Sequence, residues 1–223
     1  MALDDKATSF ASGLVRIHKV ITRGLEMIGR RGAEFAQDGF PDALTQHGFS
    51  DYAHSLITVL NEHHLSEDEV AFPALKEKLP AAPYERLAAD HRQIEGILAE
   101  VRGVMEGLME ADASQVLGDL MEAVKRIRIM WTPHIGREEI YFSEKAVSAV
   151  MDSQEQGRLN GLIAKHNQEH SDPDYLVVPF VLFNLASEDR TVMAQSLPPV
   201  IMQELVPKTW KEKWAPMKPF LLE

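Results

Sequence analysis

Cysteine is absent from all 223 residues of the chain. This absence excludes disulfide bonds, cysteine-ligated zinc and iron–sulfur clusters. Any bound metal ion must therefore be held by His, Glu or Asp. Basic residues are also few, since 23 Lys and Arg stand against 34 Asp and Glu, for a formal net charge of −11. We expect no nucleic-acid partner, because such binding requires a concentrated basic face.

Long apolar runs are missing as well. No stretch approaches the ~18 residues of a membrane span, and residues 1–9 lack the basic start and apolar run of a secretory signal. We therefore expect no membrane partner and a cytoplasmic location. With 45% hydrophobic residues, the chain can form one substantial core plus an appendage.

One short pattern occurs twice. His63 is followed four residues later by Glu67, and His134 is followed four residues later by Glu138. On a helix, side chains at i and i+4 lie on one face. Each copy therefore predicts a helix that offers two metal ligands side by side.

A single histidine in an apolar helical stretch precedes each copy, at nearly the same distance. These two histidines are His18 and His91. The repeat predicts two helical hairpins, and packing them into a four-helix bundle would bring six ligands to its axis. The predicted metal ligands are His18, His63, Glu67, His91, His134 and Glu138.

Hydrophobic spacing and capping residues predict where the helices lie. We expect helices over about 9–29, from a cap at Ser50 to about 79 with a kink at Pro73, and over 83–110. A Gly-rich connection separates the first two. Asp112 or Ser114 is expected to cap the fourth helix, and Pro133 to bend it. Asp152 and Glu155 predict a capping box for a helix ending at His170, and short helices should follow.

The four ordered segments resemble the hemerythrin-like family, also called the HHE cation-binding domain, over about residues 10–150. The resemblance implies an all-α protein built on an antiparallel four-helix bundle, which holds a non-haem di-iron centre bridged by carboxylates. We assign residues 1–150 to this bundle. Residues 151–223 are apolar and rich in proline, and we expect a helical C-terminal extension packed on the bundle.

The ligand types suit iron. Iron(II) takes imidazole and carboxylate together, and anionic groups that bridge two cations lower the cost of their repulsion. Glu67 and Glu138 are the bridge candidates, and the four histidines are the candidates for terminal ligands. Six side chains do not saturate two octahedral ions, so we expect oxo or hydroxo bridges from solvent and an open position for dioxygen, peroxide or nitric oxide.

Several residues leave alternatives open. Oxygen-carrying hemerythrins have a His-x-x-x-His pair on the third helix, whereas here Glu95 follows His91; either Glu95 is an extra ligand or one iron lacks that ligand. His64 lies about 100° round the helix from His63, which favours the outer shell of the site or solvent over a role as a ligand. For Asp68, Glu69 and Glu139 the alternatives are a solvated face or a bridging or hydrogen-bonding role. Met130 and Trp131 are either plain core or the lining of a ligand pocket, and His47 and His54 are expected at the surface. The alternatives for His166 and His170 are a second metal site, a cover for the first site or an exposed helix end.

Two functions follow from the pattern. The first is a di-iron protein that binds or senses dioxygen, nitric oxide or iron itself. The second is a di-iron oxidoreductase that consumes peroxide or nitric oxide, favoured if Glu95 is a ligand, because an added anionic donor stabilises iron(III). A third possibility keeps the bundle as an interaction module with a vestigial site. The sequence specifies no protein partner.

Overall fold

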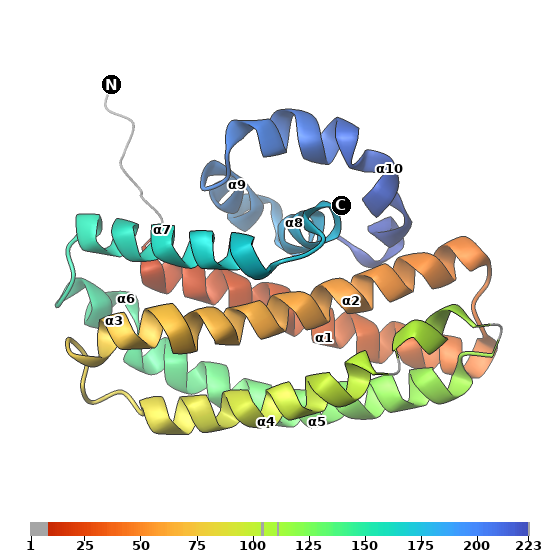
Figure 1. Cartoon of the computed structure of the whole chain (residues 1–223), viewed down its shortest axis with the longest axis horizontal. Coiled ribbons are helices and arrows are strands. Elements are labelled where there is room, and N and C mark those ends of the chain that lie inside the picture. Colours follow the sequence, from red (N-terminus) through yellow and green to blue (C-terminus); the bar gives the residue numbers. More distant parts are fainter. Residues whose placement is uncertain (1–8, 104, 111, 223) are drawn as a thin grey trace.

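Four long helices form an antiparallel bundle in the computed structural model, which describes residues 9–103, 105–110 and 112–222 (Figure 1). They are α1 (Phe10–Asp38), α2 (Ala43–Ser66), α4 (Tyr84–Arg102) and α5 (Ser114–Tyr141). No strand occurs among the described residues. The fold is therefore all-α, as the sequence predicts.

The first helix is longer than predicted. Ser9 caps its start by accepting a hydrogen bond from the backbone N–H of Ser12. Instead of ending near residue 29, α1 continues to Asp38 and stops at Gly39, whose positive φ of 76° suits glycine. The added turns place Phe35 edge-on against Phe49, with ring centroids 5.2 Å apart. Tertiary packing thus outweighs the low helix propensity of the glycines in this segment.

The second helix begins earlier than predicted. Asp42, not Ser50, is its cap, and its carboxylate accepts a hydrogen bond from the Thr45 N–H at 2.7 Å. At its other end α2 passes into a π turn, η1 (Glu67–Ala71), and then into α3 (Phe72–Lys76). Pro73 lies in the first turn of α3, where a missing N–H costs little. Where the sequence predicts a kink at Pro73, the chain instead passes through a π turn that begins at Glu67 and ends at Ala71, before the proline.

The third and fourth helices differ from expectation at their ends. α4 stops at Arg102, and residues predicted to continue it form the 3-10 turn η2 (Met105–Met109). α5 starts after Ala113 without a side-chain cap. Asp112 nevertheless accepts a hydrogen bond from the Ser114 N–H at 3.1 Å. α5 then runs through Pro133 without a break in the helix.

A short helix, α6 (Glu144–Ser148), follows α5, and the extension begins with α7 (Ser153–His170). The predicted capping box is present, because Asp152 and Glu155 exchange side-chain to backbone hydrogen bonds. α7 lies along α2 on the outside of the bundle (Figure 1). The elements that follow are short: α8 (Asp174–Phe183), α9 (Ser187–Gln195), η3 (Ile201–Thr209), α10 (Lys211–Trp214) and η4 (Ala215–Phe220).

The extension packs chiefly on α2. α8 and η4 pack against this helix. Its Tyr52 contacts the Phe180 ring of α8 and donates a hydrogen bond to Asn184 at 2.7 Å. Gly48 faces the backbone of Pro216 directly. The extension is therefore continuous with the core of the bundle. Within the described part of the chain, no helix is both long and apolar enough to span a membrane.

Candidate metal centre

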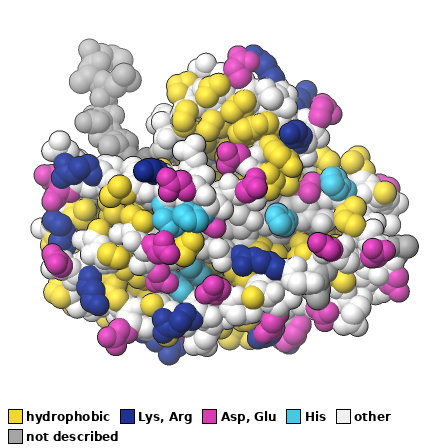
Figure 2. Space-filling view, viewed as in Figure 1, with side chains coloured by type: hydrophobic (Ala, Val, Ile, Leu, Met, Phe, Trp, Pro, Cys, Tyr) yellow, Lys and Arg dark blue, Asp and Glu magenta, His cyan; other side chains and the backbone are white. Residues whose placement is uncertain are grey.

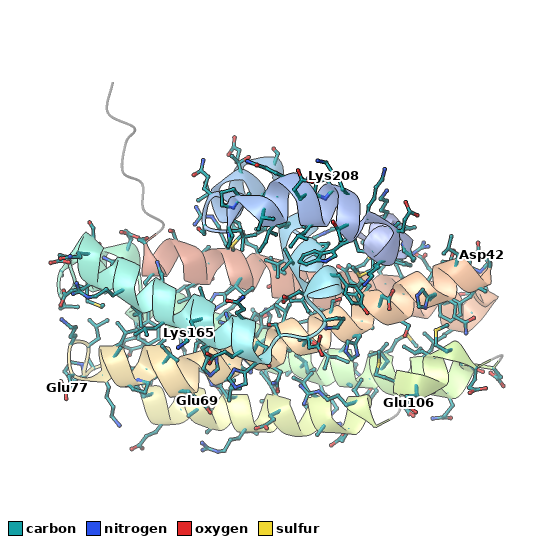
Figure 3. The ribbon with its side chains drawn as sticks, turned by 45° about the horizontal axis from the view of Figure 1, so that its top comes forward. Asp42, Glu69, Glu77, Glu106, Lys165 and Lys208 are labelled. Atoms are coloured by element: carbon teal, nitrogen blue, oxygen red, sulfur yellow. The ribbon has the colours of Figure 1, made fainter. Side chains whose placement is uncertain are left out.

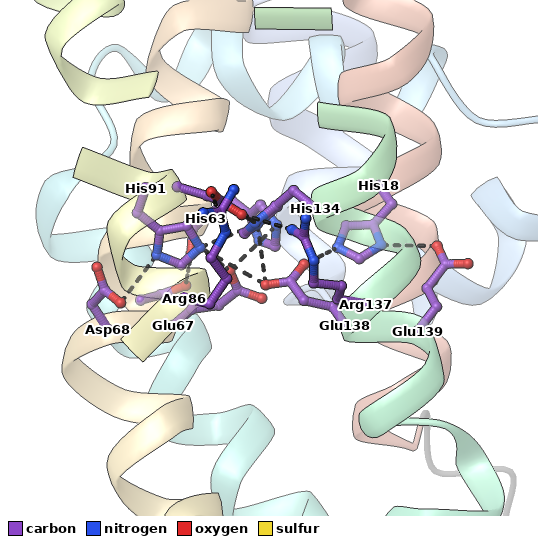
Figure 4. Close-up of polar contacts among 12 residues, drawn as sticks. His18, His63, Glu67, Asp68, Arg86, His91, His134, Arg137, Glu138 and Glu139 are labelled. Atoms are coloured by element: carbon purple, nitrogen blue, oxygen red, sulfur yellow. Dashed lines mark hydrogen bonds and ion pairs between the residues drawn. The ribbon is translucent and has the colours of Figure 1, made fainter. Parts of the chain in front are cut away.

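The six predicted ligands meet inside the bundle (Figure 4). α1 supplies one histidine, α4 another, α2 with its π turn supplies one predicted pair, and α5 supplies the other. All six side chains are buried, and His134 and Glu138 are fully enclosed. The π turn starts at Glu67 itself, and π turns inside helices are frequent at functional sites.

The ligand atoms fall into two groups of four. One group contains His18 and His63, the other contains His91 and His134, and both contain Glu67 and Glu138. Within each group the ligand atoms lie within 4.8 Å of one another. Two sites that share two carboxylates have the arrangement required for a carboxylate-bridged pair of ions.

Close contacts join each shared glutamate to histidines of both groups. His18 Nε2 lies 3.1 Å from Glu138 Oε2, and His134 Nε2 lies 3.2 Å from Glu138 Oε1. On the other glutamate, Glu67 Oε2 lies 3.4 Å from His91 Nε2 and 3.6 Å from His63 Nε2. Each glutamate therefore faces a histidine from each group.

The centre contains buried polar atoms that the protein leaves unsatisfied. Both carboxylate oxygens of Glu67 and both of Glu138 lack a hydrogen-bond partner among the described residues, as does Nε2 of His18 and of His63. Burying such groups unpaired is costly. Because imidazole and carboxylate donors suit divalent transition metals, the residues present fit a pair of bound cations, which would satisfy these atoms.

The two glutamates have opposite ionisation tendencies in the metal-free chain. Burial and the nearby Glu138 charge raise the pKa of Glu67 well above its ordinary value. Burial also disfavours ionisation of Glu138, but the nearby imidazoles of His134, His18 and His91 outweigh it and hold its pKa well below the ordinary value. Without a cation the site thus favours one negative charge over two.

The pKa values of the histidines are shifted in opposite directions too. Burial would lower the pKa of His18, but Glu138 and Glu139 outweigh it and raise that pKa. For His63 and His64, burial and the neighbouring imidazoles lower the pKa well below the ordinary value. Neutral imidazole is the form that binds a metal ion.

An outer layer of acids orients three of the histidines. Glu139 lies 2.9 Å from Nδ1 of His18, and Asp68 lies 3.0 Å from Nδ1 of His91. Both contacts leave Nε2 directed toward the centre, as carboxylates beside metal-binding histidines do. Glu139 therefore has the hydrogen-bonding role, and Asp68 lies beside His91 rather than on a purely solvated face.

Asp90 forms the third outer contact, which the sequence analysis missed. Its carboxylate lies 3.7 Å from Nδ1 of His134 and is paired with Arg137 at 2.7 Å and Arg86 at 3.2 Å. Asp90 is only 3% exposed. Its position directly before His91 is the only sequence signal that could have drawn attention to it.

His64 is part of the centre's wall rather than a solvent-facing residue. It is buried and stacks on His91 with ring centroids 4.1 Å apart. Its ligand atom groups with those of His91 and His134. Trp131 closes another side, edge-on to His18 at 5.5 Å, and its indole N–H donates to Thr22 at 2.8 Å. Trp131 is thus both core and lining.

Glu95 does not reach the centre. It is exposed and belongs to none of the ligand groups in the described part of the chain. The buried side of α4 continues from His91 to Ile94, so the residue one position further faces outward. The alternative in which Glu95 is an extra ligand is therefore wrong.

The other histidines lie elsewhere. His47 and His54 are exposed on α2, in agreement with the expected surface positions. His166 and His170 lie outside the two central groups and join Glu62 in a separate one.

A comparison with protein families identifies one match. The hemerythrin HHE cation-binding domain matches residues 10–146, which include all six residues of the two groups. The chain belongs to the hemerythrin HHE cation-binding family. No curated protein matches the chain, and no solved structure does. The family and the fold are therefore established, and cation binding is the activity that the family name carries.

Proposed function

We propose that this hemerythrin-like protein holds two non-haem irons and binds or senses dioxygen, nitric oxide or iron itself. The observation that supports this proposal is the pair of four-residue groups that share Glu67 and Glu138. In this proposal His18 and His63 would hold one ion, and His91 and His134 would hold the other. Glu67 and Glu138 would be shared between the two ions. When bound, a pair of iron(II) ions would supply an open coordination position and electrons for a small ligand.

The surrounding residues orient the ligands and limit access. Glu139 holds Nδ1 of His18 by a hydrogen bond. Asp68 and Asp90 lie beside Nδ1 of His91 and of His134, so that the Nε2 atoms face inward. Phe72 lies parallel to the His91 ring at 5.6 Å. Together with Trp131 it excludes water from the sides of the centre, which strengthens electrostatic interactions inside.

One route from solvent passes Glu139. Its side chain is 40% exposed, yet it contacts the buried His18. The same residue lines a surface groove between α1 and α5, beside Lys19 and Ser143. We expect small ligands or protons to reach the centre from this side.

The test is metal analysis of protein purified from iron-replete cells without added metal. We expect about two irons per chain and a near-ultraviolet band from an oxo bridge. Zinc alone under these conditions would contradict the proposal. Mixing the reduced protein with nitric oxide or dioxygen then shows whether a ligand binds.

The oxidoreductase alternative has lost the observation that favoured it, because Glu95 is exposed. It remains open to a direct test. Sustained turnover of peroxide or nitric oxide, abolished by Glu67→Ala, would establish an enzyme. Stoichiometric binding without turnover would reject one.

A further inference from the structure

A second cluster of metal-ligand types lies between α2 and α7, outside the centre. Glu62, His166 and His170 each offer one ligand atom, and these atoms lie within 4.8 Å of one another. Glu62 precedes His63 on α2, while the two histidines come from the extension. We propose that these three residues bind one divalent transition-metal ion, such as zinc, which ties the extension to the bundle.

The carboxylate is buried and incompletely satisfied. Glu62 is 7% exposed. One of its oxygens accepts a hydrogen bond from Asn61 at 3.3 Å, but Oε2 has no partner among the described residues. An unpaired carboxylate oxygen away from water is costly unless a cation or donor faces it. A metal ion at this position would satisfy it.

Both histidines are held in the orientation that a metal ligand requires. His170 Nδ1 lies 2.7 Å from the backbone oxygen of His166. Because a carbonyl oxygen only accepts, this nitrogen carries the hydrogen, and Nε2 keeps its lone pair. His166 Nε2 lies 3.1 Å from the Glu69 carboxylate. By the same argument, Nδ1 of His166 keeps its lone pair, and this buried atom has no partner in the described part of the chain.

These outer contacts are the ones found behind metal-bound histidines. In metal sites the nitrogen opposite the metal usually donates to a carboxylate or a backbone carbonyl, and here one histidine has each. The two rings sit one helical turn apart and stack at 4.3 Å, as in metal-binding His pairs spaced i, i+4 on a helix. The arrangement is therefore more specific than proximity alone.

The site's position agrees with this role. α7 lies against α2 and its π turn, and Figure 3 shows Glu69 close to the C-terminal part of α7, on which Lys165 is labelled. His170 of the site is exposed, and histidine side chains with acidic side chains near them are visible on the face shown in Figure 2. A solvated ion therefore has access without crossing the core.

The ligand types point to the class of ion. Two imidazoles and one carboxylate suit zinc and its neighbours in the transition series, whereas magnesium and calcium prefer oxygen ligands. In a tetrahedral zinc site the ligand atoms lie about 3.4 Å apart, from bond lengths of about 2.0–2.1 Å. A small adjustment of the side chains would meet this geometry, with water in the fourth position.

The experiment compares zinc uptake by iron-loaded protein with and without the α7 ligands. Wild type and a His166→Gln/His170→Gln variant are dialysed against zinc, and both metals are counted. We expect wild type to bind one more zinc per chain than the variant at equal iron content. A matched variant, His47→Gln/His54→Gln, removes two exposed α2 histidines and should bind as wild type does.

A milder variant tests the orientation of His166. Glu69→Gln should weaken zinc binding at this site by about 10–100-fold while keeping the ligands. Zinc should also raise the melting temperature of wild type but not of the double variant. Equal zinc uptake by wild type and the double variant would overturn the proposal, as would unchanged affinity in Glu69→Gln. The difference is independent of what the central site holds, so failure of the di-iron proposal would be distinguishable.

Discussion

Glu67 and Glu138 determine the behaviour of the centre at the scale of single residues. Both are buried, and in the metal-free chain the pKa of one is raised and that of the other lowered. Their ligand atoms lie within 4.8 Å of one another, and two ionised carboxylates this close would repel strongly in a low-dielectric interior. Bound cations remove that repulsion, so metal binding and deprotonation of Glu67 are linked.

Replacing Glu95 by histidine tests which residues surround the proposed irons. Because Glu95 is exposed, we expect Glu95→His to leave the iron content and the autoxidation rate of the reduced protein unchanged. The measurement is the rate of oxidation after mixing with dioxygen. His91→Gln on the same helix is the positive control and should lower the iron content. Slower autoxidation in Glu95→His would show that this position reaches the centre.

The six proposed ligands could be predicted because their spacing repeats along the chain. The outer layer could not. Asp90 and His64 stand beside predicted ligands in the sequence, but neighbours on a helix point about 100° apart. Whether they are buried depends on how the neighbouring helices pack against α4, which carries Asp90, and against α2, which carries His64. Spacing along one helix carries no information about that packing.

At the scale of elements, the close contact between α2 and η4 leads to a testable prediction. A Cβ atom on Gly48 would lie 2.0 Å from the backbone oxygen of Pro216. Alanine normally favours a helix over glycine by about 1 kcal/mol, but here η4 would have to move. We expect Gly48→Ala to lower the free energy of unfolding by about 1–3 kcal/mol, the usual cost of overpacking.

Gly118 in α5 provides the matched control. A Cβ there has nothing within 4 Å, so Gly118→Ala should raise the free energy of unfolding by about 0.5–1 kcal/mol. Denaturant melts of both variants give the comparison. If Gly48→Ala is as stabilising as Gly118→Ala, η4 does not rest on α2 at this point.

Docking of α9 on α1 should depend on pH. Lys19 contacts Asp189 at 2.7 Å and Arg16 contacts it at 3.2 Å, and their charges lower the pKa of Asp189 below its ordinary 3.8. A carboxyl with a lowered folded-state pKa stabilises the fold above its unfolded-state pKa, and this contribution disappears as the pH falls through the folded-state value. We expect Asp189→Asn to cost about 1 kcal/mol or less at pH 7.

That difference should begin to shrink as the pH falls below about 3.8 and should be lost below the lowered folded-state pKa of Asp189. Urea melts of wild type and Asp189→Asn across the acid range measure it. Glu188→Gln, an exposed neighbour in the same turn, is the control and should show no such trend. A constant difference between wild type and Asp189→Asn at all pH values would contradict the ion-pair account.

The order and type of the helices could be predicted from the sequence, but several boundaries could not. Local signals favoured a break after residue 29, yet Phe35 packs against Phe49 and Phe220 and keeps α1 helical. Asp42 and Ser50 are equally good caps by residue type. Which of them is used depends on how far α1 extends before the chain turns.

The extension is expected to be a necessary cover at the scale of the whole molecule. Phe49, Tyr52 and Leu56 are at most 2% exposed, and Phe49 and Tyr52 contact the rings of Phe220 and Phe180. A chain truncated before Ser153 would leave this face of α2 open to water. We expect it to aggregate, whereas the fraction that stays in solution should still take up iron at the centre.

Size-exclusion chromatography and iron analysis of the truncated chain measure both effects. A soluble, monomeric and equally stable product would show that the extension is not a necessary cover of α2. Loss of iron from soluble protein would instead show that the extension supports the centre. The full chain with its extension intact is the reference.

Anaerobic titration of metal-free protein with iron(II) tests the central claim most directly. Two groups that share Glu67 and Glu138 should bind two irons per chain and raise the melting temperature. His134→Ala should lose iron and that added stability together, because the buried acids then lack a cation. Saturation at a single iron, or a melting temperature that does not change on loading, would contradict a dinuclear centre that stabilises the bundle.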